Sequence, residues 1–93
     1  MQNFNAKYIN IDMITAEQIK GARAMLRWSA KQLAEHAGLS WPTIQRMESA
    51  EGVPSGLSKN LELIQKTLEG AGIIFIDEDE LGPGVRLREP TSR

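Results

Sequence analysis

The chain has 93 residues, of which 41% are hydrophobic and 25% charged, ordinary values for one small globular domain. It contains no cysteine, which excludes disulfide bonds and thiolate chemistry. No apolar run reaches transmembrane length and the chain opens without a signal-peptide pattern, so we expect a cytoplasmic protein. Residues 1–60 carry seven Lys and Arg against five Asp and Glu, whereas residues 61–93 carry four against seven. A weakly basic part therefore precedes an acidic one.

Residues 1–13 are polar, rich in asparagine and without helical periodicity, which predicts a flexible N-terminal extension. A short strand through Tyr8, Ile9 and Ile11 is the alternative, because these residues are β-branched or aromatic. We expect the structured domain to follow this extension and to span residues 14–72.

Three helix starts in this domain carry a capping pattern. Thr15 with Gln18, and Ser29 with Gln32, have the spacing of a capping box, in which each side chain bonds the other residue's backbone amide. Ser40 is placed to cap a third helix. Each cap is flanked by the two members of a hydrophobic staple: Ile14 with Ile19, Trp28 with Leu33, and Leu39 with Ile44.

The first of these helices is predicted to run to about Leu26, with apolar residues repeating on one face. The other two are short, and Gly38 between them ends a helix because glycine accepts a left-handed conformation at little cost. The residues from Ser29 to Glu48 therefore predict two helices joined by a tight turn. The expected inward-facing positions of the pair are Leu33, Ala34, Ala37, Leu39, Ile44 and Met47.

A turn-rich linker follows Glu48, and an amphipathic helix is predicted from a cap near Ser58 to about Gly70. Two short β-type segments then predict a β-hairpin over residues 73–88, with a disordered tail at 89–93. Because a lone hairpin is marginal in water, it must pack on the helices or pair with another chain. The apolar stripe of the amphipathic helix consists of Leu57, Leu61, Ile64 and Leu68.

The helix pair resembles the helix–turn–helix of the phage repressor and Cro family, the xenobiotic-response-element regulators. The residues that carry the resemblance are Leu33-Ala34, Gly38, Ser40, Thr43-Ile44 and Glu48. The resemblance implies a mainly α, lambda-repressor-like helix–turn–helix bundle of four to five short helices, here followed by the C-terminal β-hairpin. Two positions depart from the family: Ala30 replaces a common glutamine, and Ser49-Ala50 replaces the usual Asn-Gly.

In this family the second helix of the pair enters the DNA major groove, so the resemblance implies that residues 41–48 read base edges. Arg46 suits bidentate bonding to guanine, and Gln45 suits adenine or a phosphate. Trp41 has an alternative, partial burial against the neighbouring helix. The predicted base contacts are Ser40, Trp41, Pro42, Gln45 and Arg46, and the predicted phosphate contacts are Arg27, Ser29, Lys31, Thr43 and Lys59.

Arg23 lies beside the apolar face of the first helix, and from the residues alone it can be a solvated surface charge. Proteins of the repressor family often pair such an arginine with the glutamate that closes the second helix of the pair. The resemblance therefore implies a structural ion pair between Arg23 and Glu48.

No catalytic constellation is present in the sequence. His36 is the only histidine and is predicted to be a surface residue, with no Cys or second His to share a metal. The acidic run at residues 77–80 lacks the spacing of a calcium loop and predicts a solvated turn. We therefore expect no enzyme activity, no cofactor and no metal.

The sequence thus predicts a sequence-specific DNA-binding transcriptional regulator, and we expect it to be a repressor. A single reading helix covers few base pairs, so a homodimer on a palindromic operator is expected, with the hairpin at or near the interface. One alternative is the antitoxin of a toxin–antitoxin pair that binds its toxin through the C-terminal region and autoregulates its operon. Another is an adaptor whose helix pair docks on a protein.

Overall fold

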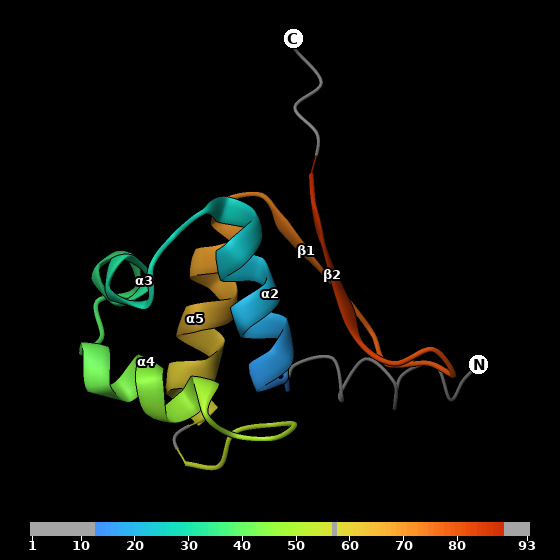
Figure 1. The fold of residues 1–93 in the computed structure, drawn as a ribbon, viewed down its shortest axis with the longest axis horizontal. Helices are drawn as coiled ribbons and strands as arrows, with labels where there is room; N and C mark the ends of the chain where they lie inside the picture. The colour runs from blue at the N-terminus through green and yellow to red at the C-terminus, as the bar shows by residue number, and fades with distance from the viewer. Residues whose placement is uncertain (1–12, 57, 89–93) are drawn as a thin grey trace, which may run out of the picture.

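The computed structural model describes residues 13–56 and 58–88. Within these ranges the chain forms four helices followed by a two-stranded antiparallel hairpin, which is the mainly helical small domain that the sequence predicts (Figure 1). The expectations for residues 1–12, for Leu57 and for the tail at 89–93 lie outside the described residues. The elements are α2 (Ala16–Leu26), α3 (Ala30–Ala37), α4 (Trp41–Glu48), α5 (Ser58–Gly70), β1 (Ile73–Ile76) and β2 (Gly84–Leu87).

The predicted caps begin the first three of these helices. The Thr15 hydroxyl accepts from the Gln18 amide at 3.0 Å, and Gln18 Oε1 accepts from the Thr15 amide at 2.9 Å. Ser29 and Gln32 form the same reciprocal pair at 3.0 and 2.8 Å. Ser40 accepts from the amide three residues later at 3.2 Å. Each cap satisfies amide groups that the first turn of a helix leaves without partners.

Two left-handed residues make the turns between helices short. Gly38 follows α3 with φ of 72°, as the sequence predicts. Arg27 follows α2 with φ of 60°, a conformation that non-glycine side chains rarely adopt, and its amide donates to the Ala24 carbonyl at 3.0 Å. Because each turn takes only three residues, α2, α3 and α4 fold onto one another around a single core.

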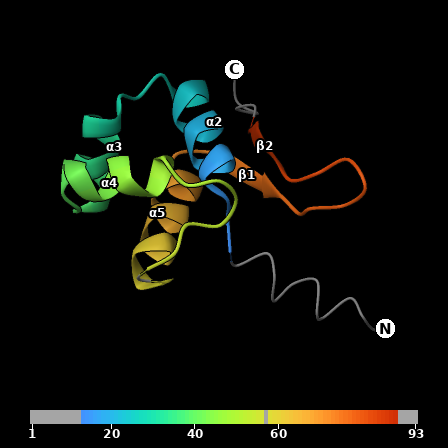
Figure 2. The same cartoon turned by 60° about the horizontal axis from the view of Figure 1, so that its bottom comes forward.

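The four helices lie against one another (Figure 2), and the buried apolar residues of all four form one core between them. Leu39 is only partly buried at its edge, because it lies in the turn between α3 and α4. The other predicted inward-facing residues are buried. The buried members of the core are Ile14, Ile19, Ala22, Leu33, Ala34, Ala37, Ile44, Met47, Leu61, Ile64, Leu68 and Ile73.

The hairpin packs on the helices, β1 against α5 and β2 against α2. Ile73 pairs with Leu87 and Phe75 with Val85, and this face of the hairpin meets the core. Gly21 permits the close approach of β2, because a Cβ atom there would lie 3.3 Å from Cγ2 of Val85. Of the two arrangements that the sequence allows for the hairpin, packing on its own helices is therefore present.

Gln18 links α2 to the hairpin as well as capping the helix. Its side-chain amide donates to the carbonyls of Ile76 at 3.2 Å and Gly84 at 2.9 Å, while its oxygen accepts from Thr15. The residue is only 6% exposed, so water has little access to these groups. The side chain therefore satisfies polar atoms in both a helix cap and the end of the two strands.

The substitution Gln18→Glu tests this link. A glutamate side chain would keep the capping acceptor but lose both donors, leaving two carbonyls facing a carboxylate, so we expect a loss of about 1–3 kcal/mol of stability. Gln32→Glu is the matched control, because Gln32 occupies the equivalent cap position, is exposed and has no bond to a distant element among the described residues. Thermal or urea unfolding at neutral pH measures both variants. Equal unfolding midpoints would contradict the role of Gln18.

Candidate nucleic-acid interface

Helix α4 has one buried face and one exposed face. Ile44 and Met47 enter the core, and Glu48 is buried beside them. The opposite side carries polar, aromatic and basic side chains, and Trp41 on this side is 47% exposed, so about half of its surface remains open to a ligand. The exposed residues of α4 are Trp41, Pro42, Gln45 and Arg46.

Local bonds define where α4 begins. Ser40 accepts from the Thr43 amide, and the two hydroxyl groups lie 2.8 Å apart. Pro42 stands in the first turn, where its missing amide proton leaves no intrahelical bond unmade. The backbone therefore fixes the direction in which the exposed side chains of α4 leave the helix.

An ion pair ties the end of α4 to α2. Arg23 Nε donates to Glu48 Oε2 at 2.8 Å and its terminal nitrogen donates to Oε1 at 2.9 Å, so the contact is bidentate. The other terminal nitrogen donates to the Trp28 carbonyl at 3.0 Å, in the turn before α3. The side chains of Arg23 and Glu48 are 24% and 10% exposed. The ion pair that the resemblance implies is therefore present, and one guanidinium of α2 bonds both the end of α4 and the turn before α3.

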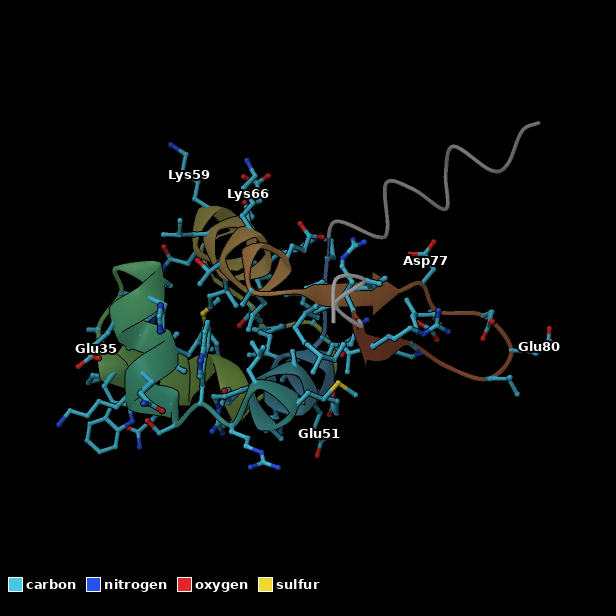
Figure 3. The ribbon with its side chains drawn as sticks, turned by 90° about the horizontal axis from the view of Figure 1, so that it is seen from above. Glu35, Glu51, Lys59, Lys66, Asp77 and Glu80 are labelled. Atoms are coloured by element: carbon cyan, nitrogen blue, oxygen red, sulfur yellow. The ribbon has the colours of Figure 1, made fainter. Side chains whose placement is uncertain are left out.

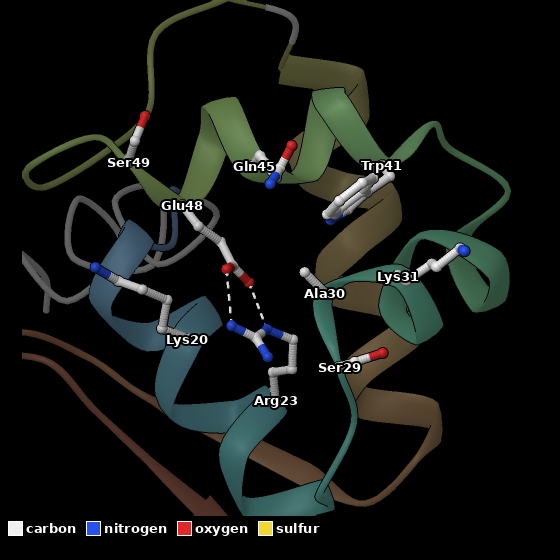
Figure 4. Close-up of a pocket in the computed structure, with 9 residues that line it drawn as sticks. All are labelled: Lys20, Arg23, Ser29, Ala30, Lys31, Trp41, Gln45, Glu48 and Ser49. Carbon is white, nitrogen blue, oxygen red and sulfur yellow. Dashed lines mark hydrogen bonds and ion pairs between the residues drawn. The ribbon is translucent and has the colours of Figure 1, made fainter.

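A shallow open depression of about 470 Å³ lies above this ion pair. Figure 4 shows Trp41 and Gln45 on α4 facing the start of α3, where Ser29 and Lys31 stand. Ala30 lines the same depression, at the position where the resembling family often has a glutamine. The full lining is Lys20, Arg23, Ser29, Ala30, Lys31, Trp41, Gln45, Glu48 and Ser49.

The depression is electrostatically positive although the chain as a whole is not. Glu48 is its only carboxylate, and Arg23 neutralises it. Lys20 and Lys31 remain, on opposite sides of the ion pair in Figure 4, and neither forms an ion pair within the described ranges. A polyanion that reached this surface would therefore meet two lysines and the amide-bearing start of α3.

The structure brings together only part of the predicted contact set. Trp41 and Gln45 from the base-reading group share the depression with Ser29 and Lys31 from the phosphate group. Arg46 is exposed on α4 but does not line the depression. Lys59 lies at the start of α5 (Figure 3) and does not line it either. Predicted contacts that do not line the depression are Arg27, Ser40, Pro42, Thr43, Arg46 and Lys59.

Two features of this surface are absent from the sequence predictions. Lys20 lines the depression because it stands one helical turn before Arg23, a spacing that is visible in the sequence. Trp28 stacks on His36 with ring centroids 4.1 Å apart and planes at 7°. His36 is exposed, as expected. Its ring also covers one side of the Trp28 indole and so packs against the turn before α3.

In the described part of the chain no group of three or more His, Asp or Glu residues is arranged to hold a metal ion. The helices of residues 13–56 and 58–88 are too short and too polar to cross a bilayer. No protein-family model matches the chain, and no curated protein matches it. The geometry of α3, α4 and their surroundings is therefore the basis for any functional proposal.

The burial of the ion pair predicts unequal effects of its two single replacements. Arg23→Met strands the more buried Glu48 carboxylate and removes the bond to Trp28, so we expect a loss of about 3 kcal/mol. Glu48→Met leaves an arginine that can still reach water, and we expect about 1–2 kcal/mol. The double replacement should cost less than the sum. Chemical unfolding of the four proteins measures the coupling.

Arg46→Met is the control for this cycle, because it removes an exposed arginine from the same helix without breaking an ion pair. Its expected change in stability is within about 0.5 kcal/mol. Additive and equally small effects of the Arg23 and Glu48 replacements would show that the pair does not hold α4 in place.

Proposed function

We propose that this chain is a sequence-specific DNA-binding transcriptional regulator and, more specifically, a repressor. In this proposal α4 reads operator DNA in the major groove. The observation that carries the proposal is the two-sided character of α4. Its buried side is held by the core and by the Arg23–Glu48 pair, while its other side presents side chains suited to base edges. The major groove is about 12 Å wide and accepts such a helix.

The start of α3 supplies the second support. Ser29 and Lys31 flank the depression beside α4, and Lys20 faces it from α2. Backbone amides at a helix start and lysine side chains both favour phosphate oxygens, so a DNA backbone lying along this edge would orient the protein. The local positive charge also reconciles the proposal with the net charge of −1.

In this proposal the roles follow from exposure and chemistry. Gln45 and Arg46 bond base edges, while Trp41 and Pro42 make apolar contact, for which a thymine methyl is the natural target. The hydroxyl groups of Ser40 and Thr43 form a hydrogen bond with each other, so we assign both residues the role of holding the start of α4 beside the groove. The proposed phosphate contacts are those expected from the sequence, Arg27, Ser29, Lys31, Thr43 and Lys59, to which we add Lys20 because it lines the depression.

A homodimer belongs to the proposal, because one α4 reads too few base pairs to select a site among genomic competitors. Two copies related by a two-fold axis would place their helices about one DNA turn apart on a palindromic operator. A cytoplasmic location is part of the same proposal.

Duplex selection followed by titration tests the proposal. A site is first selected from random duplex DNA, and affinity is then measured at two salt concentrations, where we expect a steep loss with salt from counterion release. Arg46→Ala should cost about 1–3 kcal/mol and relax preference at one base pair. Lys31→Ala should weaken selected and random DNA alike and reduce the salt slope by about one.

Lys66→Ala is the matched control, because it removes an exposed lysine of α5 that is outside the proposed contact set. Its affinity and salt slope should equal those of the parent protein. Failure to enrich any duplex, or binding without salt dependence, would contradict the proposal that this chain binds operator DNA.

A further inference from the structure

The hairpin has a second face that does not pack on the helical core. Ile73 and Phe75 pack on the helical core, so the alternation of side chains along a strand places Ile74 and Ile76 on the other face. Both latter residues are partly exposed and neither packs against the core. Figures 1 and 2 show the described helices on one side of the hairpin. We call the side that carries Ile74, Ile76 and Arg86 the open face.

Charges at the two ends of the hairpin are of opposite sign. The turn holds four consecutive acids at residues 77–80, and Figure 3 shows Asp77 beside the end of β1 and Glu80 at the far end of the turn. Arg86 lies across from Ile74, and Arg88 lies opposite Gly72 beyond the last strand pair, so both arginines are on the half of the hairpin away from the acidic turn, and both are exposed. None of these charged residues forms an ion pair with another described residue. The hairpin is therefore acidic at its tip, and it carries its two arginines on the half nearer its base, one of them beside the apolar residues of the open face.

We propose that two copies of this chain associate by stacking their open faces in antiparallel orientation. A two-fold axis then brings Ile74 and Ile76 of both copies together, and it sets the acidic tip of each hairpin against the basic base of the other. The same patch serves both copies, as a two-fold interface requires. The open faces would provide the dimer surface that the proposed function requires. The biological role of this dimer rests on the proposed function, but the association itself requires no DNA.

Charge complementarity selects a second copy in this orientation. Parallel stacking would oppose acid to acid and base to base, which is unfavourable at short range. Antiparallel stacking forms both attractive contacts at once. It also leaves the helices of both copies on the outside of the paired sheets, where α3 and α4 remain accessible.

Reversed charges test the orientation directly. Arg86→Glu with Arg88→Glu makes both ends of the hairpin acidic. Glu78→Lys with Glu80→Lys brings the tip from four net negative charges to zero, because Asp77 and Asp79 remain, and so removes its attraction to the basic residues. Each double variant alone should self-associate about a hundredfold more weakly than the parent chain. An equimolar mixture should recover a 1:1 heterodimer, because the acidic tip of the first variant meets Arg86 and Arg88 of the second, while the neutral tip of the second is not repelled by the acidic base of the first. Sedimentation equilibrium of the full chain without DNA measures all three.

Two further variants keep the test independent of misfolding. Glu62→Lys with Glu69→Lys reverses the same number of acids on exposed positions of α5 and should leave association unchanged. Ile74→Thr with Ile76→Thr keeps β-branched side chains but removes apolar area, and should weaken association at least tenfold with little change in melting temperature. Asp79 is left intact because its carboxylate accepts from the Leu81 amide in the turn at 2.8 Å.

Several outcomes would overturn the inference. The parent chain could be monomeric at every concentration, the mixture could fail to associate, or the threonine variant could melt much earlier, which would show that the chain itself covers the open face. Association with a foreign protein through an unpaired hairpin would favour the antitoxin alternative. If the variants behave as expected but no duplex is selected, the DNA proposal fails and the dimer remains.

Discussion

The guanidinium of Arg23 joins the helix that begins the domain to the helix that presents the candidate interface. It bonds both oxygens of Glu48 at the end of α4 and the backbone of Trp28 before α3. Because α3 and α4 have eight residues each, neither would be stable in isolation, and their relative placement depends on such contacts. Solvent partly reaches the ion pair, so its main effect is on the position of α4. The outer side of α4 can stay exposed because the ion pair holds its inner side against α2.

Helix α2 connects two regions that lie far apart in the sequence. Its first turn holds the end of the hairpin through Gln18, and its third turn holds α4 through Arg23. Gly21 lies between them and lets β2 approach closely. One helix therefore positions both the candidate nucleic-acid interface and the hairpin proposed to join two copies. A dimer formed through the hairpin would set the separation of the two reading surfaces through this rigid connection.

Net charge alone would argue against nucleic-acid binding, yet the distribution of charge matters more over the screening distance of about 10 Å in ordinary salt. The acids gather in the hairpin turn, whereas Lys20 and Lys31 stand by α4 and the one carboxylate between them is neutralised. The acidic turn has its own counterpart in Arg86 and Arg88 at the base of the hairpin. Because its charges are segregated in this way, a small domain can present two surfaces that favour different binding partners.

Local sequence determined the beginnings and ends of the helices. Caps at Thr15, Ser29 and Ser40 and the left-handed Gly38 depend on bonds within a few residues, so spacing alone predicted them. The hairpin followed in the same way from its alternating segments. The resemblance to repressors added the partner of Arg23, which no local pattern could identify.

Tertiary structure decided the contacts between distant segments. The donors of Gln18 reach strands about sixty residues away, and the stacking of Trp28 on His36 depends on the angle between a turn and α3. The lining of the depression likewise required the packing of three helices, which brought in Lys20 and left Arg46 and Lys59 outside. Sequence spacing encodes bonds within one turn of helix or strand. Which exposed side chains share a surface is set by how the helices cross, and only the folded chain contains that information.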